Sequence, residues 1–241
     1  ALPECTAMSQ GYIGAHLQNA ILREVRKEGM PWYAATVVTQ VVVDEKDPAF
    51  QKPTKPIGAF YDEQTARARM KADPSAVYAE DAGRGWRQMV ASPKPVDIVE
   101  KESILNLLDH EFIVIACGGG GVPVVKKGNG DYVTVPAVID KDFASAKLAE
   151  LVGADYLFIL TAVDRVAIRY GTPQQEDLAE LTVEEAKRYC DEGHFAPGSM
   201  LPKVQAAISF AQSGPGRRAV IASLEKAPLA MKGESGTMIH A

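Results

Sequence analysis

Apolar residues recur at helical spacing close to the N-terminus of the chain. The pattern predicts a helix that is capped at Ser9 or Gln10 and runs to about Lys27, with a loop over residues 1–6 before it. Gly29 then stops the helix. The residues that set the spacing are Tyr12, Ile13, His16, Leu17, Ala20, Ile21 and Val25.

Strands and helices alternate along most of the remaining chain. A run dense in Val and Thr over residues 34–43 predicts one buried strand. Further strands are expected at 112–116, 122–125, 132–135, 156–160, 219–222 and 237–239, and helices at 99–108, 142–152, from Thr182, from Pro202 to Ser213 and at 225–231. Such alternation predicts an α/β protein with a largely parallel sheet covered on both faces.

The segment from Phe50 to Lys94 departs from this pattern. It is rich in Pro, Gly and charged residues, and only a helix near residues 62–71 stands out. We expect a small lobe here, of the kind that serves as a lid or substrate cover.

Composition narrows the class of protein. The chain has 241 residues, of which 46% are hydrophobic and 24% charged, enough for one large domain or two small ones. Its net charge of -5 argues against a nucleic-acid partner. No apolar run is long enough to span a bilayer and no signal peptide is visible, so no membrane partner is expected.

The three cysteines, Cys5, Cys117 and Cys190, are widely spaced and form no CxxC pair. This usage argues against a disulfide framework or a zinc site and fits a reducing cytoplasm. Each is predicted to be a small buried apolar residue. The histidines show no metal-ligand spacing and there is no GxSxG sequence, so no metal ligands are assigned.

Four consecutive glycines, Gly118, Gly119, Gly120 and Gly121, follow a predicted strand directly. Glycine lets backbone N–H groups approach an anion closely at the end of a strand, where ligands bind in open α/β sheets. The run is neither a GxGxxG nor a Walker A sequence. A tight turn without ligand is the alternative, but four glycines cost folding entropy and favour the phosphate interpretation.

Two lysines stand at predicted helix starts, where a cation opposes the helix dipole unless an anion binds. Lys141 lies between Asp140 and Asp142, and Asp142 could simply cap the helix. Lys203 follows Gly198-Ser199-Met200-Leu201-Pro202. For either lysine the alternative is a solvated surface side chain.

The predicted lobe carries further cations. Lys55 stands between two prolines in Pro53-Thr54-Lys55-Pro56, a stiff loop suited to reach an anionic substrate or an ordinary exposed turn. Arg84 and Arg87 could clamp a phosphate, but pairing with Glu80 and Asp81 is the favoured interpretation.

Together these motifs resemble the carbamate kinases, a branch of the amino acid kinase family. The matching pieces are Ala7-Met8-Ser9-Gln10-Gly11, Asp47-Pro48-Ala49-Phe50, Pro53-Thr54-Lys55-Pro56, Glu80-Asp81-Ala82-Gly83-Arg84-Gly85, Ser92-Pro93-Lys94-Pro95, Gly118 to Gly121, Val138 to Asp142, Gly193-His194-Phe195 and Gly198 to Lys203. They run in family order along nearly the whole chain.

The resemblance implies a three-layer α/β/α sandwich with a mainly parallel sheet, forming one domain over residues 1–241 with a protruding lid over 47–95. It also implies an ATP-dependent phosphotransferase of arginine metabolism that uses ATP or ADP with Mg²⁺, acts on carbamoyl phosphate and carbamate, and forms a cytoplasmic homodimer.

The resemblance also implies roles for particular residues. Lys141 and Lys203 would neutralise the transferring phosphoryl group, Asp142 would orient these lysines or the metal, and Lys55 would reach from the lid. Phosphate or substrate would bind at Gly118 to Gly121 and Ser199, and the nucleotide near Thr161, Tyr170 and Met200.

The chain also departs from the family pattern. A first strand ending in Gly-Gly-Asn-Ala and a later Gly-Asn-Gly-Pro-Gln loop are absent, so we expect a chain that lacks the family's N-terminal part and is inactive alone. Ala162, Pro197 and Leu201 replace the usual Asp, Ala and Gly. Ala162 and Leu201 also occur together in divergent members, which leaves open a kinase of another carbamoyl or amino-acid-like substrate, or a non-catalytic nucleotide-binding paralogue.

Overall fold

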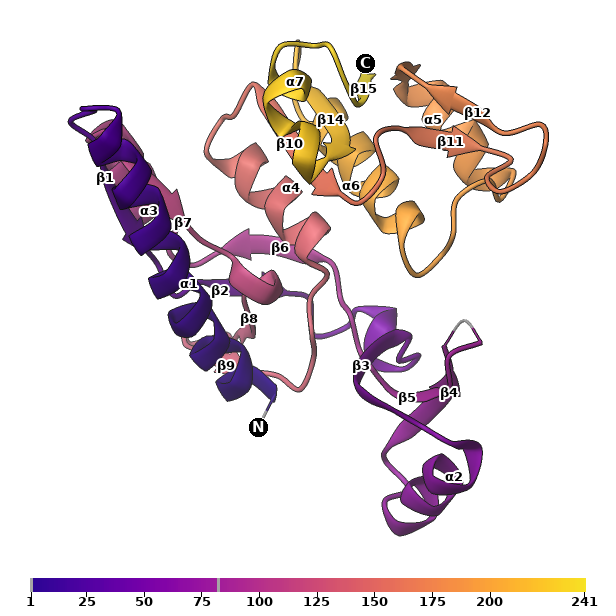
Figure 1. Ribbon diagram of the computed structural model, residues 1–241. Coiled ribbons are helices and arrows are strands. Elements are labelled where there is room, and N and C mark those ends of the chain that lie inside the picture. The colour runs from indigo at the N-terminus through magenta and orange to yellow at the C-terminus, as the bar shows by residue number, and fades with distance from the viewer. Residues whose placement is uncertain (1, 82) are drawn as a thin grey trace. The chain divides into compact units, whose positions relative to one another are not determined.

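The computed structural model describes residues 2–81 and 83–241 (Figure 1). Internal contacts divide the chain into two compact units. The first holds the residues up to Glu100 together with Asn106–Asp140, and the second holds Lys101–Leu105 and Lys141–Ala241. The predicted lid over 47–95 lies wholly within the first unit, and the single domain over residues 1–241 stays a prediction.

The first unit begins with helix α1 (Leu2–Lys27), which starts earlier than predicted. The expected loop over residues 1–6 is wrong for residues 2–6, because Pro3 is tolerated in a first helical turn. The residues that α1 buries are Pro3, Gln10, Gly14 and Val25. A Cβ on Gly14 would lie 2.1 Å from Thr36 Cγ2, so this close packing requires glycine.

The predicted strand over 34–43 is in fact two strands in separate sheets. Strand β1 (Tyr33–Thr36) pairs in parallel with β7 (Phe112–Ile115). Strand β2 (Gln40–Val43) lies between β6 (Pro95–Ile98), antiparallel, and β8 (Val122–Lys126), parallel. The break falls at Thr39, whose side chain donates to Val37 O at 2.9 Å. Strand β9 (Tyr132–Thr134) completes the second sheet beside β8, as an antiparallel partner.

The predicted lobe is a small sheet with one helix. After the short helix η1 (Pro48–Phe50), strands β3 (Lys55–Tyr61), β4 (Val77–Glu80) and β5 (Trp86–Val90) form an antiparallel sheet in the order β3-β5-β4. The predicted helix is confirmed as α2 (Glu63–Ala72), with Asp62 accepting from Thr65 N–H at 2.7 Å.

The two arginines of the lobe hold its loop. Arg84 and Arg87 bind Asp81 Oδ2 at 3.2 and 3.3 Å, and both guanidinium groups lie 5.0 Å from the Phe60 ring centre. Their predicted structural role is confirmed. Ala82 of the same motif lies outside the described residues.

The second unit is built on the mixed sheet β10-β14-β15-β13, formed by β10 (Tyr156–Thr161), β14 (Arg218–Ser223), β15 (Thr237–His240) and β13 (Glu180–Thr182). Strands β10 and β14 are parallel, as are β13 and β15. A hairpin of β11 (Val166–Ile168) and β12 (Glu176–Leu178) follows β10. Helix α3 (Lys101–Asp109) is divided between the units.

Helices cover both faces of this sheet because side chains alternate along its strands. One face packs on α4 (Lys141–Leu151), α5 (Val183–Asp191) and α6 (Met200–Gln212) through Leu157, Ile159, Ala219, Ile221 and Ile239. The other packs Val220 and Ala222 on Ala230 of α7 (Ala227–Met231), which follows η3 (Leu224–Lys226). The predicted capping box of α5, Thr182 with Glu185, is confirmed.

The cysteines meet different environments. Cys117 is buried as predicted, Cys190 is half-buried, and Cys5 is exposed, so the prediction of burial is wrong for Cys5 because α1 turns that position to solvent. Burial raises the pKa of the Cys117 thiol to about 12, with a smaller contribution from the Glu100 carboxylate. Within residues 2–81 and 83–241, no helix is both long and apolar enough to cross a membrane.

Candidate active site

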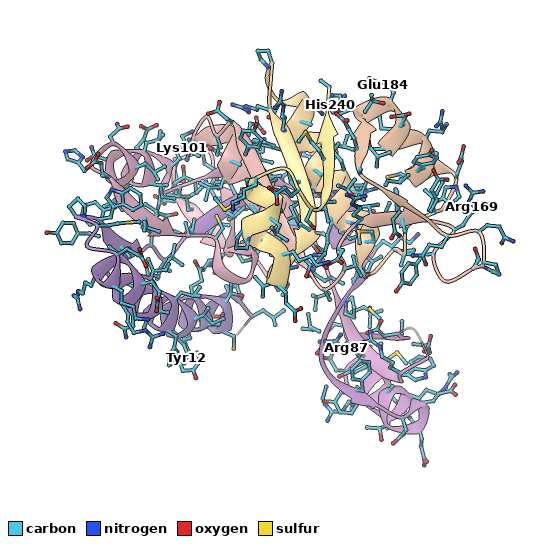
Figure 2. The ribbon with its side chains drawn as sticks, turned by 45° about the horizontal axis from the view of Figure 1, so that its top comes forward. Tyr12, Arg87, Lys101, Arg169, Glu184 and His240 are labelled. Atoms are coloured by element: carbon cyan, nitrogen blue, oxygen red, sulfur yellow. The ribbon has the colours of Figure 1, made fainter. Side chains whose placement is uncertain are left out.

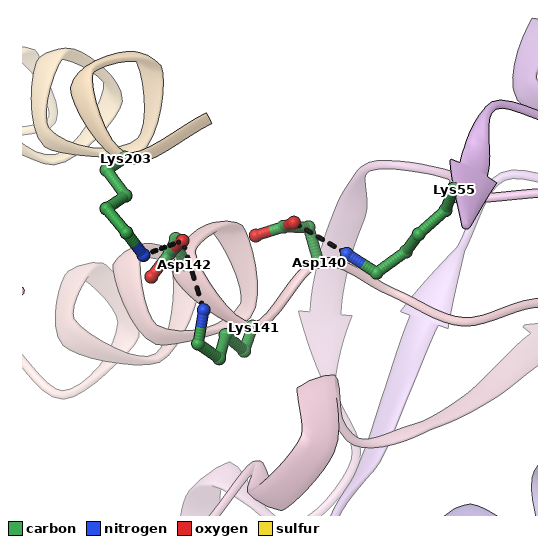
Figure 3. A network of polar contacts seen from close by, with 5 residues as sticks. All are labelled: Lys55, Asp140, Lys141, Asp142 and Lys203. Atoms are coloured by element: carbon green, nitrogen blue, oxygen red, sulfur yellow. Dashed lines mark hydrogen bonds and ion pairs between the residues drawn. The ribbon is translucent and has the colours of Figure 1, made fainter. Parts of the chain in front are cut away.

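Two lysines of the second unit share one carboxylate (Figure 3). Lys203 Nζ, in the first turn of α6, lies 2.9 Å from Asp142 Oδ2, and Lys141 Nζ lies 3.4 Å from the same oxygen. The Asp142 and Lys203 side chains are only 9% and 13% exposed, whereas Lys141 is 64% exposed. The group therefore carries a net positive charge with one cation held firmly and one facing solvent.

The start of α4 explains how Asp142 comes to hold these lysines. The helix begins at Lys141, so Asp142 lies in its first turn and the alternative of Asp142 as the cap is wrong. A carboxylate in the first turn complements the positive end of the helix dipole. Two ammonium groups gathered at a helix N-terminus make an environment that attracts a phosphoryl group.

In the first unit, the predicted substrate lysine is held by a residue that sequence reasoning left without a role. Lys55 Nζ, at the start of β3, lies 2.7 Å from Asp140 Oδ2, and the side chains are 27% and 17% exposed (Figure 3). The Val138 to Asp142 motif had signalled Lys141 and Asp142 only. Asp140 could have been found from its place in the same motif.

The glycine run forms a one-turn helix, η2 (Gly118–Gly120), after β7. Its hydrogen bonds run from Gly120 N–H to Cys117 O and from Gly121 N–H to Gly118 O, so the first two N–H groups fall outside the helical pattern. A Cβ on Gly120 would lie 2.1 Å from Ile139 O, and one on Gly121 would lie 2.3 Å from Val41 Cγ2. Packing alone thus requires glycine at these two positions.

Gln10 supports this turn and was also missed as a contributor. It is 3% exposed; its amide oxygen accepts from Thr39 N–H at 2.9 Å and its amide nitrogen donates to Thr39 O at 3.2 Å. Thr39 Oγ1 in turn accepts from Cys117 N–H at 3.0 Å. The conspicuous Ala7 to Gly11 motif therefore fixes the backbone that leads into the glycine run.

A cavity of about 460 Å³ opens in the second unit between the β11–β12 hairpin and the loop before α6. Three of the predicted ligand-binding residues, Tyr170, Ser199 and Met200, line it, and Thr161 does not. Its other lining residues are Val163, Arg165, Ala167, Arg169, Thr172 and 193–196.

The lining suits a flat, partly apolar ligand that carries negative charge. Val163, Ala167 and Phe195 supply apolar surface, and Arg165 and Arg169 supply cations. Tyr170 is 69% exposed, so its ring is free for stacking on a base. The part of the chain that the structure describes has no group of three or more His, Cys, Asp or Glu side chains able to hold a metal.

Comparison with known proteins agrees with this chemistry. The sequence pattern of the amino acid kinase family matches residues 38–223, most of the chain. The chain belongs to the amino acid kinase family. This kinase is 56% identical over 233 residues to the carbamate kinase of Clostridium perfringens, covering 97% of the chain and 74% of that relative. It is 53% identical to the carbamate kinase-like protein YqeA of Escherichia coli, covering 98% of the chain and 75% of that relative.

Solved structures give the same assignment for the fold of this kinase. The carbamate kinase from Giardia lamblia bound to AMP-PNP superposes with a TM-score of 0.88 at 45% identity, covering 99% of this chain and 75% of that one. The predicted α/β class and amino acid kinase fold are thereby confirmed.

Proposed function

We propose that this amino acid kinase is a carbamate kinase, which transfers a phosphoryl group reversibly between carbamoyl phosphate with ADP and carbamate with ATP. The observation that carries the proposal is the pair Lys141 and Lys203 held on Asp142. Several relatives named carbamate kinase, about half identical in sequence over nearly the whole chain, support carbamate and carbamoyl phosphate as the substrates.

The residues act mainly by positioning and charge neutralisation, because phosphoryl transfer needs little covalent catalysis. Lys203 and Lys141 bind oxygens of the transferring phosphoryl group, and Asp142 orients both ammonium groups. Lys55 binds carbamoyl phosphate. Backbone N–H groups of Gly118 and Gly119 donate to the phosphate or carbamate oxygens.

The nucleotide occupies the cavity beside the β11–β12 hairpin. Its base lies on Tyr170 and Met200, and Ser199 donates to a phosphate oxygen. Thr161 is the last residue of β10, two residues before Val163 of the cavity lining. Mg²⁺ bound with the nucleotide would supply further charge neutralisation, and Asp142 would orient it or the two lysines. The volume of about 460 Å³ and the two lining arginines support this assignment.

A different acceptor is the second candidate function. Ala162 and Leu201 depart from the usual carbamate kinase residues, and one relative at 53% identity is named only carbamate kinase-like. Leu201 lies in the first turn of α6, two residues from Lys203, and packs against the hydrophobic core of the second unit. Another small carbamoyl or amino-acid-like substrate would then replace carbamate.

The deciding assay is ATP formation from ADP and carbamoyl phosphate with Mg²⁺. In the full-length gene product we expect turnover, lost in Lys203→Met and kept in Lys187→Met, which removes an exposed lysine of α5 in the same unit. A protein that binds ADP but forms no ATP would refute the assignment. A panel of carbamoyl and acyl phosphates then separates another acceptor from a nucleotide-binding paralogue without activity.

The predicted homodimer is a further part of this proposal. Helix α1 exposes large apolar side chains, with Met8 75% and Tyr12 69% exposed, and Tyr12 projects away from the helix (Figure 2). We assign this face to contact with a second copy. Light scattering should give twice the chain mass, and Tyr12→Glu should shift it toward the monomer; a monomer without the substitution would contradict the assignment.

The cellular setting follows from the same proposal. All three cysteines are free, which suits the reducing cytoplasm. A place in arginine metabolism follows from the resemblance to carbamate kinases alone.

A further inference from the structure

Both ends of the predicted lid segment converge on Asp140. Near its N-terminal end, Lys55 makes the 2.7 Å ion pair with Asp140 Oδ2. Near its C-terminal end, the Lys94 ammonium interacts electrostatically with Asp140 and with Asp47. All four residues belong to the first unit.

A second carboxylate ties the ends of the segment together without engaging Lys55. Asp47 Oδ2 accepts from Lys94 N–H at 2.9 Å, and Asp47 Oδ1 accepts from Ala49 N–H at 2.8 Å. Burial lowers the pKa of Lys94, and the two carboxylates oppose that shift. Asp47 therefore holds the backbone at the base of the lid and lies near Lys94, whereas Asp140 interacts with the side chains of both Lys55 and Lys94.

We propose that Asp140 is a positioning residue that occupies Lys55 in place of the substrate's phosphate, which must displace the carboxylate to reach the lysine. The inference rests on the proposed function, because Lys55 is assigned there to carbamoyl phosphate. Asp140 thus holds the lysine ready and sets the affinity for the anion that replaces it.

The exposure of the pair supports exchange. The Lys55 and Asp140 side chains are 27% and 17% exposed, so an incoming anion can reach the ammonium group. A dianionic phosphate close to Lys55 is also repelled by Asp140, since like charges at short range oppose one another. Removing the negative charge should therefore strengthen binding of the substrate anion.

Asp140→Asn is the appropriate variant because it removes charge and keeps shape. Asp140 directly precedes α4, and Asn is as favourable as Asp at that position, so the helix start is preserved. We expect the KM for carbamoyl phosphate to fall roughly three- to tenfold, the scale of a partly exposed ion pair, with the KM for ADP unchanged.

The matched control is Glu45→Gln, which breaks the Lys127–Glu45 pair, also 2.7 Å long and in the same unit. It should leave both KM values unchanged. In a Lys55→Met background, Asp140→Asn should lower the KM for carbamoyl phosphate by a smaller factor, because only the direct repulsion between carboxylate and phosphate is then removed. A KM that stays constant or rises in Asp140→Asn, or a fall that is equally large without Lys55, overturns the proposal.

Calorimetric titration with inorganic phosphate tests the site without turnover. Asp140→Asn should bind phosphate more tightly by the same roughly three- to tenfold factor. Tighter phosphate binding without ATP formation in any variant would support the proposed role of Asp140 and reject carbamate kinase activity. Unchanged phosphate binding in an active enzyme would reject the proposed role of Asp140 alone.

Discussion

The Asp142→Asn substitution tests most directly whether one carboxylate organises both lysines of the second unit. Asparagine keeps the size of the side chain and one oxygen acceptor but removes the negative charge. Lys203, at 13% exposure, would then keep its ammonium group in a buried setting without a counter-ion. Lys141 would lose only a weak contact at 3.4 Å in a largely exposed position.

The expected cost to stability follows from this burial. Breaking a fully buried ion pair costs about 3–5 kcal/mol, and the retained amide oxygen reduces this, so we expect about 2 kcal/mol. For a chain of this length that lowers the Tm by roughly 4–8 °C. In activity, both ammonium groups lose their orientation toward the phosphoryl group, and kcat should fall roughly 10²–10³-fold.

A double-mutant cycle with Lys203→Met separates charge burial from other causes. Once the ammonium group is gone, the Asp142→Asn change should cost little more, so the double variant should be more stable than the summed single effects by roughly 1–2 kcal/mol. Urea unfolding gives the stabilities, and ATP formation gives kcat. Strictly additive stability losses would show that Asp142 and Lys203 are independent, and the account of the site would fail.

Three further predictions follow from single positions. Gly120→Ala should prevent folding or lower the free energy of unfolding by more than about 3 kcal/mol, judged by urea unfolding, because its Cβ meets Ile139 O at 2.1 Å. Cys117 should resist a thiol reagent at about pH 8, because its folded pKa of about 12 lies above its ordinary 9.0. The contribution of the neutral thiol to the free energy of unfolding is therefore complete below pH 9 and is lost as pH rises toward 12. Tyr170→Ala should raise the KM for ADP roughly three- to tenfold and leave the KM for carbamoyl phosphate unchanged, checked by steady-state kinetics.

Helix ends with local capping chemistry were predictable from sequence. The start of α5 follows from Thr182 and Glu185, three residues apart, because the side chain of each accepts from the backbone N–H of the other. The start of α2 follows from Asp62, whose side chain accepts from Thr65 N–H. Both signals lie within one helical turn, so no distant part of the chain is needed to interpret them.

Features decided by distant contacts were not predictable. The break of the 34–43 run depends on Thr39, whose backbone is held by Gln10 from α1 and whose hydroxyl accepts from Cys117 N–H. The buried side of α1 depends on Gly14 fitting against Thr36. Periodicity indicated the α1 helix itself, but Tyr12, Ile13 and Leu17 of its apolar stripe remain exposed, whereas Val25 is buried.

The candidate site was also predictable only in part. Small residues and lysines at helix starts indicated Lys141 and Lys203, because a cation there opposes the helix dipole unless an anion binds. That one carboxylate, Asp142, would hold both followed only from the family resemblance, since the lysines are far apart in sequence. The pairing of Lys55 with Asp140, which joins the lid to the stretch before α4, could not be predicted.

The glycine run shows why one sequence signal can have two physical causes. Gly120 and Gly121 are required by packing against Ile139 and Val41, so their presence alone says nothing about a ligand. Gly119 differs: it is exposed, and a Cβ there would have no contact closer than 3.9 Å. Its φ of 65° costs an L-residue about 1–2 kcal/mol. The phosphate interpretation therefore depends on Gly118 and Gly119, and a loss of carbamoyl phosphate affinity in Gly119→Ala beyond that small folding cost would distinguish binding from packing.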